Sequence, residues 1–392
     1  MKDTTTLPVD GSTVAMDRRI VALDGFRGLM TVLVVFSHFY GEVRSGIPAL
    51  MMGWLAVDAF FVLSGYLIGR LILDKAKHKN FFWVFYVRRI CRTFPIYFFC
   101  VIGVFYIDDA FHPATTYQQQ ASFPLWTYVA FVQNFWMVSY NAIGQHWLSP
   151  TWTLAVEEQF YLIAPAMIVF TPRRFLMPLL VSLVALALAS RIYFLNSSEI
   201  SGFAAQIMLI SNADLLVAGI IAAVALKTWK LDWARYDQFL RVAPVALLTA
   251  AMVLTIITGS DSYLFKSLAQ TLVSAAFALM IMSLVRGSPE ASRYEHKVWC
   301  FFGNISYAVY LTHLTVLGIL HNLVLGTAPD IGTPAQIAVT TAALPLTVLI
   351  SWILTKIVEE PITAYGRSFK WSKETVERQS QSRPAAQAST NS

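Results

Sequence analysis

Charged side chains are scarce in this sequence of 392 residues. Asp, Glu, Lys and Arg together make up 13% of it, whereas 56% of the residues are hydrophobic. A soluble globular protein carries roughly 25% charged residues, so this chain has about half the usual share. A fold in water cannot hide so much apolar surface, but a lipid bilayer accepts it. The composition excludes an ordinary soluble domain and predicts an integral membrane protein.

Cysteine is also rare. Cys91, Cys100 and Cys300 lie within or beside apolar or cytoplasm-facing segments, and they form neither CxxC pairs nor clusters with histidine. This pattern excludes a disulfide framework, and no metal site is predicted.

Residues 1–19 lack the basic-then-apolar pattern of a cleaved signal peptide. We therefore expect the first apolar segment to be an uncleaved targeting signal.

Long apolar stretches dominate what remains. Ten of them approach the roughly 20 residues that a helix needs to cross a bilayer. An eleventh, about 122–139, is rich in aromatic residues and glutamine, and is predicted to lie at the outer interface or to re-enter from it. The predicted fold is all-α, a polytopic transmembrane helix bundle with about ten spans: 21–41, 50–70, 94–109, 150–171, 176–195, 204–226, 242–258, 264–285, 298–323 and 336–357.

Basic residues are absent from the whole stretch between Ile107 and Pro150. With ten spans and the N-terminus inside, nearly all lysines and arginines fall in inner loops, as the positive-inside rule requires. Counting 122–139 as a span would place Arg173 and Arg174 outside. The net charge of +6 therefore indicates membrane topology, and no nucleic-acid partner is predicted.

The same topology divides the chain into three parts. We expect a cytoplasmic N-terminal segment at 1–19, a single membrane domain at 20–367, and a disordered cytoplasmic tail at 368–392 that is rich in Gln, Ser and Ala. Both termini are predicted to be cytoplasmic.

Ionisable side chains inside the spans are the most informative residues, because each costs at least about 2.5–3.5 kcal/mol to insert near the bilayer centre. Arg27 and His38 share one face of the first span and are about 16 Å apart along its axis. Asp58, Glu157 and His313 fall near the depth of His38, each on a different span. These residues predict one polar acid–base site towards the outer side.

A second group lies towards the inside. Arg88, Arg89 and Arg92 come just before Pro95, where the third span is predicted to begin. Arg89 and Arg92 are three residues apart on one helical face and form a potential anion clamp with Arg27. An inner phosphate clamp and an outer acid–base site predict a phosphorylated donor inside and an acceptor outside. The same arginines also satisfy the positive-inside rule, and Asp58 also fits a structural partner of an arginine.

Two other functional classes also place charged residues in a membrane protein or need no catalytic site. Buried charges also suit a proton-coupled transporter or a flippase, but no internal repeat is found and a carrier of small solutes needs no cytoplasmic arginine pair. A membrane scaffold leaves the buried charges unexplained.

Several elements, in order over about residues 18–367, resemble the acyltransferase-3 family of bacterial membrane O-acyltransferases. Each is weak alone, and together they are specific. They are the start at 19–28, the Arg27-x10-His38 pattern, the second-span signature at 53–66, the Arg-x-x-Arg element at 85–92, the block from Trp152 to Tyr161, the segment 303–313 and Glu359-Glu360-Pro361.

The resemblance implies transfer of an acyl group, most often from acetyl-CoA, to a hydroxyl of a cell-surface glycan or glycolipid precursor. The protein would be a multi-pass protein of the cell inner (plasma) membrane, in contact with membrane lipid. No oligomeric state is predicted.

The resemblance also implies roles for residues. His38 would act as general base with Glu157 orienting it, or would form an acyl-histidine. The implied sites are catalytic His38, Glu157, Asp58 and His313, coenzyme-binding Arg27, Arg88, Arg89 and Arg92, and substrate-binding Thr153, Tyr161 and Trp152. Two departures stand out. Thr153 replaces the usual serine, and Asn212 stands where the family often has an arginine two residues before Asp214. The second departure removes a charge and predicts a change in the acceptor or in the pairing of Asp214.

Overall fold

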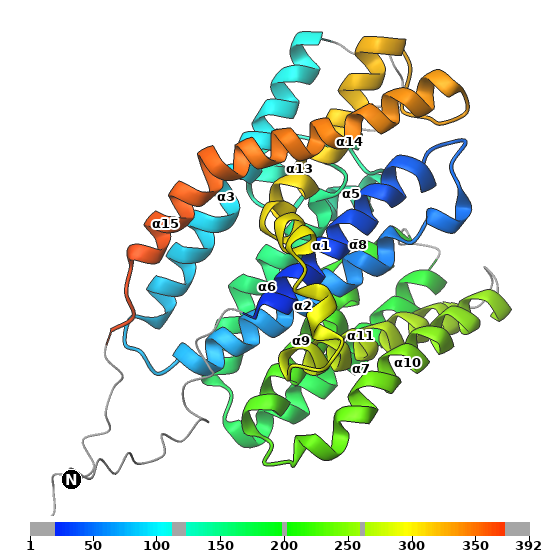
Figure 1. The fold of residues 1–392 in the computed structure, drawn as a ribbon. Coiled ribbons are helices and arrows are strands. Elements are labelled where there is room, and N and C mark those ends of the chain that lie inside the picture. The colour runs from blue at the N-terminus through cyan, green and yellow to red at the C-terminus, as the bar shows by residue number, and fades with distance from the viewer. Residues whose placement is uncertain (1–19, 112–122, 198–201, 259–262, 373–392) are drawn as a thin grey trace, which may run out of the picture.

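A computed structural model describes residues 20–111, 123–197, 202–258 and 263–372 (Figure 1). All regular elements in these ranges are helices, as predicted. They are α1 (Val21–Phe36), η2 (Ser37–Gly41), η3 (Pro48–Leu50), α2 (Gly53–Lys75), α3 (Phe81–Phe111), α4 (Leu125–Val129), α5 (Gln133–Tyr140), η4 (His146–Leu148), α6 (Thr151–Phe170), α7 (Arg173–Asn196), α8 (Phe203–Ile207), α9 (Leu209–Thr228), η5 (Trp233–Tyr236), α10 (Asp237–Thr258), α11 (Tyr263–Val285), α12 (Ala291–Tyr294), α13 (Lys297–Leu325), α14 (Pro334–Leu354), η6 (Thr355–Glu359) and α15 (Glu360–Ser368).

Ten helical segments in the described ranges are long and apolar enough to cross a membrane, which confirms the predicted number. They are 21–41, 48–75, 81–107, 151–170, 173–196, 203–228, 233–257, 267–285, 297–325 and 334–368. Large apolar side chains such as Val245, Ile256 and Ile257 of α10 are exposed on the outside of the bundle, as on a helix that faces lipid. The chain is thus a multi-pass membrane protein.

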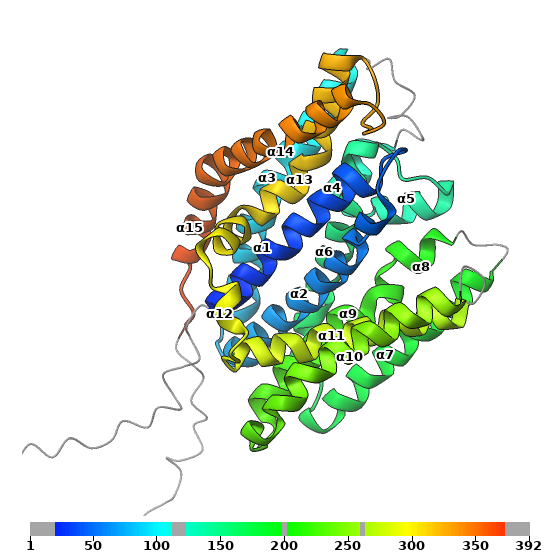
Figure 2. The same ribbon diagram turned by 45° about the vertical axis from the view of Figure 1, so that its right-hand side comes forward.

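The long helices form three layers (Figure 2). Helices α7, α9, α10 and α11 lie on one side, α1, α2 and α6 in the middle, and α3, α13, α14 and α15 on the other. The predicted interfacial segment at 122–139 contains two short helices, α4 and α5, and neither is long enough to span a membrane. It is therefore not an eleventh span.

The third span differs from its predicted bounds. Helix α3 begins at Phe81 and continues through Pro95, so Arg88, Arg89 and Arg92 lie inside the helix and not in a loop before it. Proline is tolerated within membrane helices when neighbouring groups satisfy the freed carbonyl. The arginines therefore point from a packed helix into the protein, each in a direction fixed by the helical period.

Glycines allow α1 and α13 to touch backbone to backbone. A Cβ atom on Gly28 would lie 1.9 Å from the carbonyl oxygen of Trp299, and one on Gly303 would lie 2.0 Å from that of Asp24. Small residues at such crossings let membrane helices approach closely. This contact determines which side chains further along α1 and α13 can meet.

The C-terminal segment is ordered beyond its predicted boundary. The tail was expected to be disordered from residue 368, but Arg88 donates hydrogen bonds to the carbonyl oxygen of Phe369, at 2.6 Å from Nη2, and Asn80 accepts one from the backbone N–H of Ser372 at 2.9 Å. These contacts tie residues 369–372 to the start of α3, because their backbone groups find partners there. The predicted segment 1–19 and the rest of the tail, 373–392, lie outside the described residues.

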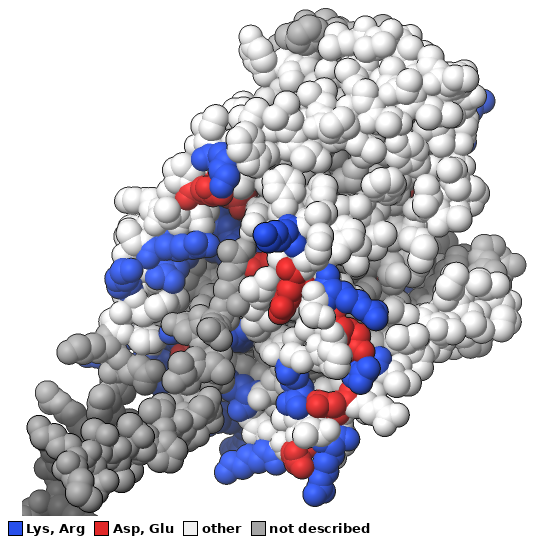
Figure 3. Space-filling model, viewed as in Figure 1, with Lys and Arg blue, Asp and Glu red and all other residues white. Residues whose placement is uncertain are grey.

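Charged side chains gather at one end of the bundle, and the remainder of the face in Figure 3 is almost entirely uncharged. Ion pairs at this end link loops and helix ends: Lys227 with Asp74, Arg241 with Glu290 at 2.6 Å, and Arg286 with Asp237 at 2.9 Å.

Candidate functional site

A partly exposed histidine, His38, and a buried one, His313, meet near the uncharged end of the bundle. His38 lies in the π-helical turn η2, and His313 lies on α13. The Nδ1 atom of His38 is 2.6 Å from Nε2 of His313. The sequence placed these residues at the same depth, and the close contact of α1 and α13 brings them into a direct hydrogen bond.

The hydrogen-bond network assigns the tautomers of this histidine pair. Nδ1 of His313 is 3.1 Å from the carbonyl oxygen of Val309, which can only accept, so this nitrogen carries the hydrogen. In the neutral ring Nε2 of His313 is then the acceptor, and Nδ1 of His38 is the donor. Nε2 of His38 keeps its lone pair, as a general base requires.

Glu42 faces that lone pair, and the sequence analysis missed it. Its Oε2 atom lies 3.4 Å from Nε2 of His38. Ser37 donates a hydrogen bond to Oε1 of Glu42 at 2.8 Å and accepts one from the backbone N–H of Gly53 at 2.9 Å. The spacing of four residues from His38 is a signal, but Glu42 lies just beyond the predicted first span, 21–41.

His146 completes the polar surroundings of this pair. Its charge would act on His38, His313 and Glu42, and burial lowers the pKa of His146 to about 4 despite the nearby carboxylate of Glu42. Partial burial raises the pKa of Glu42, and the Ser37 hydrogen bond opposes this shift. At neutral pH His146 is therefore uncharged.

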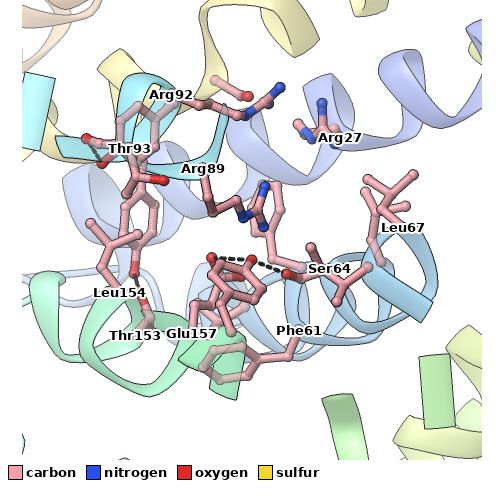
Figure 4. Close-up of a pocket in the computed structure, with 18 of the residues that line it drawn as sticks. Arg27, Phe61, Ser64, Leu67, Arg89, Arg92, Thr93, Thr153, Leu154 and Glu157 are labelled. Carbon is pink, nitrogen blue, oxygen red and sulfur yellow. Dashed lines mark hydrogen bonds between the residues drawn. The ribbon is translucent and has the colours of Figure 1, made fainter. Parts of the chain in front are cut away.

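A cavity of about 280 Å³ lies on the other side of these histidines, between α1, α2, α3, α6 and α13 (Figure 4). Its walls are mainly apolar and aromatic. The polar lining residues are Arg27, Ser64, Arg89, Arg92, Thr93, Thr153, Glu157, Tyr161, Ser306, Tyr307 and Tyr310. Of the predicted site residues, Arg27, Arg89, Arg92, Thr153, Glu157 and Tyr161 thus line one cavity.

Glu157 is held within the cavity and away from His38. The hydroxyl of Tyr161 donates to Oε2 of Glu157 at 3.0 Å and is also hydrogen-bonded to Ser64 (Figure 4). The guanidinium of Arg89 lies over the ring of Tyr161, 3.8 Å from its centroid. The predicted orientation of His38 by Glu157 is not seen, because Tyr161, Ser64 and Arg89 surround this carboxylate.

Tyr310 connects the cavity to the histidine pair. Its hydroxyl is 2.8 Å from that of Thr153 and donates to the carbonyl oxygen of Pro150 at 3.0 Å. Its ring centroid is 6.0 Å from that of His313. One aromatic side chain therefore separates the cavity from the catalytic candidates.

A second, wider cavity of about 870 Å³ opens at the charged end. Arg27 and Arg92 line both cavities. The wider one also carries Arg70, Lys75 and Arg367, and the carboxylates of Asp24, Asp74, Glu359 and Glu360. Arg27 lies 3.6 Å from Asp24, whereas Arg92 forms no hydrogen bond or ion pair within the described part of the chain.

The predicted arginine clamp is thus only partly assembled. Arg27 and Arg92 stand at the junction of the two cavities, and Arg89 lies beside the carboxylates of Glu157 and Glu158, which act on its charge. Arg88 points the other way and binds the C-terminal segment through the carbonyl oxygen of Phe369.

Two further predicted residues lie outside both cavities. Asp58 is buried on α2, and the charges that act on it are those of Asp214 and Arg191, not of the histidines. Trp152 packs edge-on against Phe61, which itself lines the cavity, so it supports the wall from behind. The residues that the sequence analysis assigned to a single outer site therefore lie in separate places.

Within the described ranges, no group of three or more His, Cys, Asp or Glu residues is arranged to hold a metal ion.

Comparison with known proteins decides among the classes that such a site could serve. The family model for an acyltransferase domain, Acyl_transf_3, matches residues 20–356. This chain belongs to the acyltransferase-3 family.

Curated relatives carry matching names. The O-acetyltransferase OatA of Staphylococcus aureus (strain NCTC 8325 / PS 47) is 27% identical over 371 residues, which cover 89% of this chain and 58% of the relative. A putative O-acetyltransferase of Staphylococcus aureus (strain COL) is 24% identical over 330 residues, with 78% and 52% covered. The chain thus spans a little more than half the length of these acyltransferase-3 relatives. No solved structure matches.

One departure from the acyltransferase-3 pattern is compensated in space. Arg191 of α7 forms a two-pronged ion pair with Asp214, at 2.7 and 2.8 Å, and bonds Thr271 at 2.6 Å. Asn212, which stands where the family often has arginine, instead donates to the carbonyl oxygens of Gln206 and Met208. The charge that balances Asp214 therefore comes from Arg191 on a different helix.

Proposed function

We propose that this protein transfers an acyl group, in the first instance acetyl, from cytoplasmic acyl-CoA to a hydroxyl of a cell-surface glycan or glycolipid precursor. The acceptor would be met at the outer face of the inner (plasma) membrane. One observation carries the proposal: two cavities share Arg27 and Arg92, and the narrower one ends at Tyr310 beside the His38–His313 pair. Family membership favours this reading over a transporter or flippase.

The charged end of the bundle supports the proposed orientation. Basic residues prefer the cytoplasmic side of a membrane protein, and the end that holds Lys227, Arg241 and Arg286 is the one with the wide cavity. We place this end, and with it both termini, in the cytoplasm. His38 then lies near the outer face.

The wide cavity suits the phosphates of the coenzyme. Arginine binds phosphate through paired N–H donors. Arg92 forms no ion pair with a carboxylate of the described residues, although the charge of Glu359 acts on it across the wide cavity. From Arg27 to His38 the path measures about 16 Å along α1, which the extended pantetheine arm is long enough to bridge. The mainly apolar walls of the narrow cavity fit that arm.

The chemistry follows from the tautomers. Nε2 of His38 takes the proton of the acceptor hydroxyl while its oxygen forms the ester bond to the acyl carbon. The carbon–sulfur bond breaks, and the thiolate receives the proton from His38. Tyr310 and Thr153 would line the last part of the path of the thioester. The step needs no other reactant.

The test of this function is mass spectrometry of surface glycans and glycolipids from cells that lack the gene and from cells complemented with the wild type. We expect one acyl mass to disappear in the deletion strain and to return on complementation, which would also name the acyl group and the acceptor. If no acyl ester changes, the proposed function is wrong.

Replacing Arg92 by alanine is expected to raise the KM for acyl-CoA by about tenfold or more, because a hydrogen bond to a charged group contributes about 1.5–3 kcal/mol. The kcat at saturating donor should change little. Arg88→Ala is the matched control, since it removes the same charge from the same helix outside both cavities. Equal KM values for the two variants would contradict the placing of the phosphates at Arg92.

A further inference from the structure

We infer that Glu42 is a positioning residue for the transfer step, which orients His38 and balances the positive charge that forms on its ring. This inference rests on the proposed function. The Arg27-x10-His38 element ends at His38, and none of the family elements includes Glu42. The assignment comes from the contacts around the turn η2.

The turn η2 brings Ser37, His38 and Glu42 together. The backbone N–H of Glu42 bonds the carbonyl oxygen of Ser37 at 2.8 Å, five residues back, which makes this turn wider than an α-helical one. Such single π-helical turns occur frequently at functional sites. Here the wide turn allows Ser37 and His38 to reach the same carboxylate, through Oε1 and Oε2 respectively.

Glu42 is also fixed from a second helix. Ser37, which donates to Glu42, is itself buried and accepts the N–H of Gly53 at the first residue of α2. A Cβ atom on Gly53 would lie 2.8 Å from the Ser37 oxygen, so the start of α2 closes on this serine. The carboxylate therefore has one firmly held oxygen, Oε1, and one that faces His38.

The arrangement favours a hydroxyl group at the base. Nε2 of His38 and Oε2 of Glu42 are both acceptors, 3.4 Å apart, so the O–H of an acceptor hydroxyl directed between them meets two acceptors. The side chain of Glu42 is 42% exposed and that of His38 is 19% exposed, so an acceptor can reach them.

Proton transfer then turns the ring of His38 into a cation in a largely buried place. A buried charge is costly unless it is paired. The titratable groups that face the ring are His313 on α13, His146 on η4 and Glu42. His313 is a neutral hydrogen-bond acceptor, and His146 is uncharged at neutral pH. Only Glu42 offers a negative charge among the described residues in contact with the ring.

The test compares Glu42→Gln with the wild type in acyl transfer by the full-length protein in membrane vesicles, with radiolabelled acetyl-CoA as donor. We expect kcat to fall about tenfold or more, with the KM for acetyl-CoA unchanged. The acid limb of the pH–rate profile should move to lower pH, because the wild-type carboxylate favours protonation of His38 and the glutamine does not. Glu42→Asp should restore part of the rate.

Glu290→Gln is the matched control, because Glu290 pairs with Arg241 at the opposite end of the bundle. A Glu42→Gln enzyme with the rate and profile of the wild type overturns the inference. A loss that is equal at every pH, and that Glu42→Asp does not repair, also overturns it, since that result marks a packing role. If Glu42→Gln does not fold, Ser37→Ala and Glu42→Asp carry the same test through the shift of the acid limb. Absence of transfer by the wild type would instead contradict the proposed function.

Discussion

The His38→Ala variant is expected to lose acyl transfer by about 10²–10⁴-fold, the range that a positioned general base contributes. The structure gives the reason in the tautomers: His313 uses Nδ1 to bind Val309, so Nε2 of His38 is the free lone pair of the histidine pair. The measurement is the initial rate of ester formation in vesicles at saturating acetyl-CoA.

His296→Ala provides the matched control for this loss. His296 is exposed at the start of α13, far along the helix from His313, and accepts the N–H of Val298. It should retain the wild-type rate apart from a modest loss of stability. Near-normal transfer by His38→Ala, with protein levels equal to the wild type, would refute the catalytic assignment.

A large loss of stability is expected for Arg191→Met. The side chain of Arg191 is 2% exposed and that of Asp214 is 0% exposed, and each oxygen of the carboxylate is bound by one nitrogen of the guanidinium. Removing one partner of a buried pair leaves an uncompensated charge and typically costs about 3–5 kcal/mol. Thermal unfolding in detergent, together with the amount of protein in the membrane, measures the loss.

The double variant Arg191→Met/Asp214→Leu separates the pair from its parts. Because it removes both charges, it should recover most of the stability that the single variant loses. A single variant as stable as the wild type would show that Asp214 finds another partner. Asp58 cannot be that partner, because it is also a carboxylate and the charge of Asp214 already acts against its own.

The spans could be predicted from the sequence because hydropathy and the positive-inside rule act locally. The ten predicted spans correspond to the ten in the structure, and the segment at 122–139 was rightly kept apart from them. The boundary of the third span was missed because the charges of Arg88, Arg89 and Arg92 placed these residues on the cytoplasmic side before the span, which was predicted to begin near Pro95. In the folded protein Arg88 binds the carbonyl oxygen of Phe369, Arg89 lies over the ring of Tyr161, and Arg92 lines both cavities.

The sequence could not predict which of the buried ionisable side chains are neighbours. Counting residues along each helix placed His38, Asp58, Glu157 and His313 at similar heights, but which side chains meet depends on how the helices pack. The glycine contact between α1 and α13 joins His38 to His313. Asp58 faces the Arg191–Asp214 pair instead. Glu42 was not predicted, because its four-residue interval from His38 does not reveal the π-helical turn that brings Ser37, His38 and Glu42 together.

Arg27 and Arg92 line both cavities, and this determines on which side of the membrane the coenzyme stays. On the proposed route the nucleotide end never leaves the side of the membrane on which it arrived, since the same two cations hold it before and after the ester forms. Only the acyl group reaches the far side. The spent thiol withdraws along its own path and rejoins the cytoplasmic pool, so the cell exports a modification without exporting its carrier.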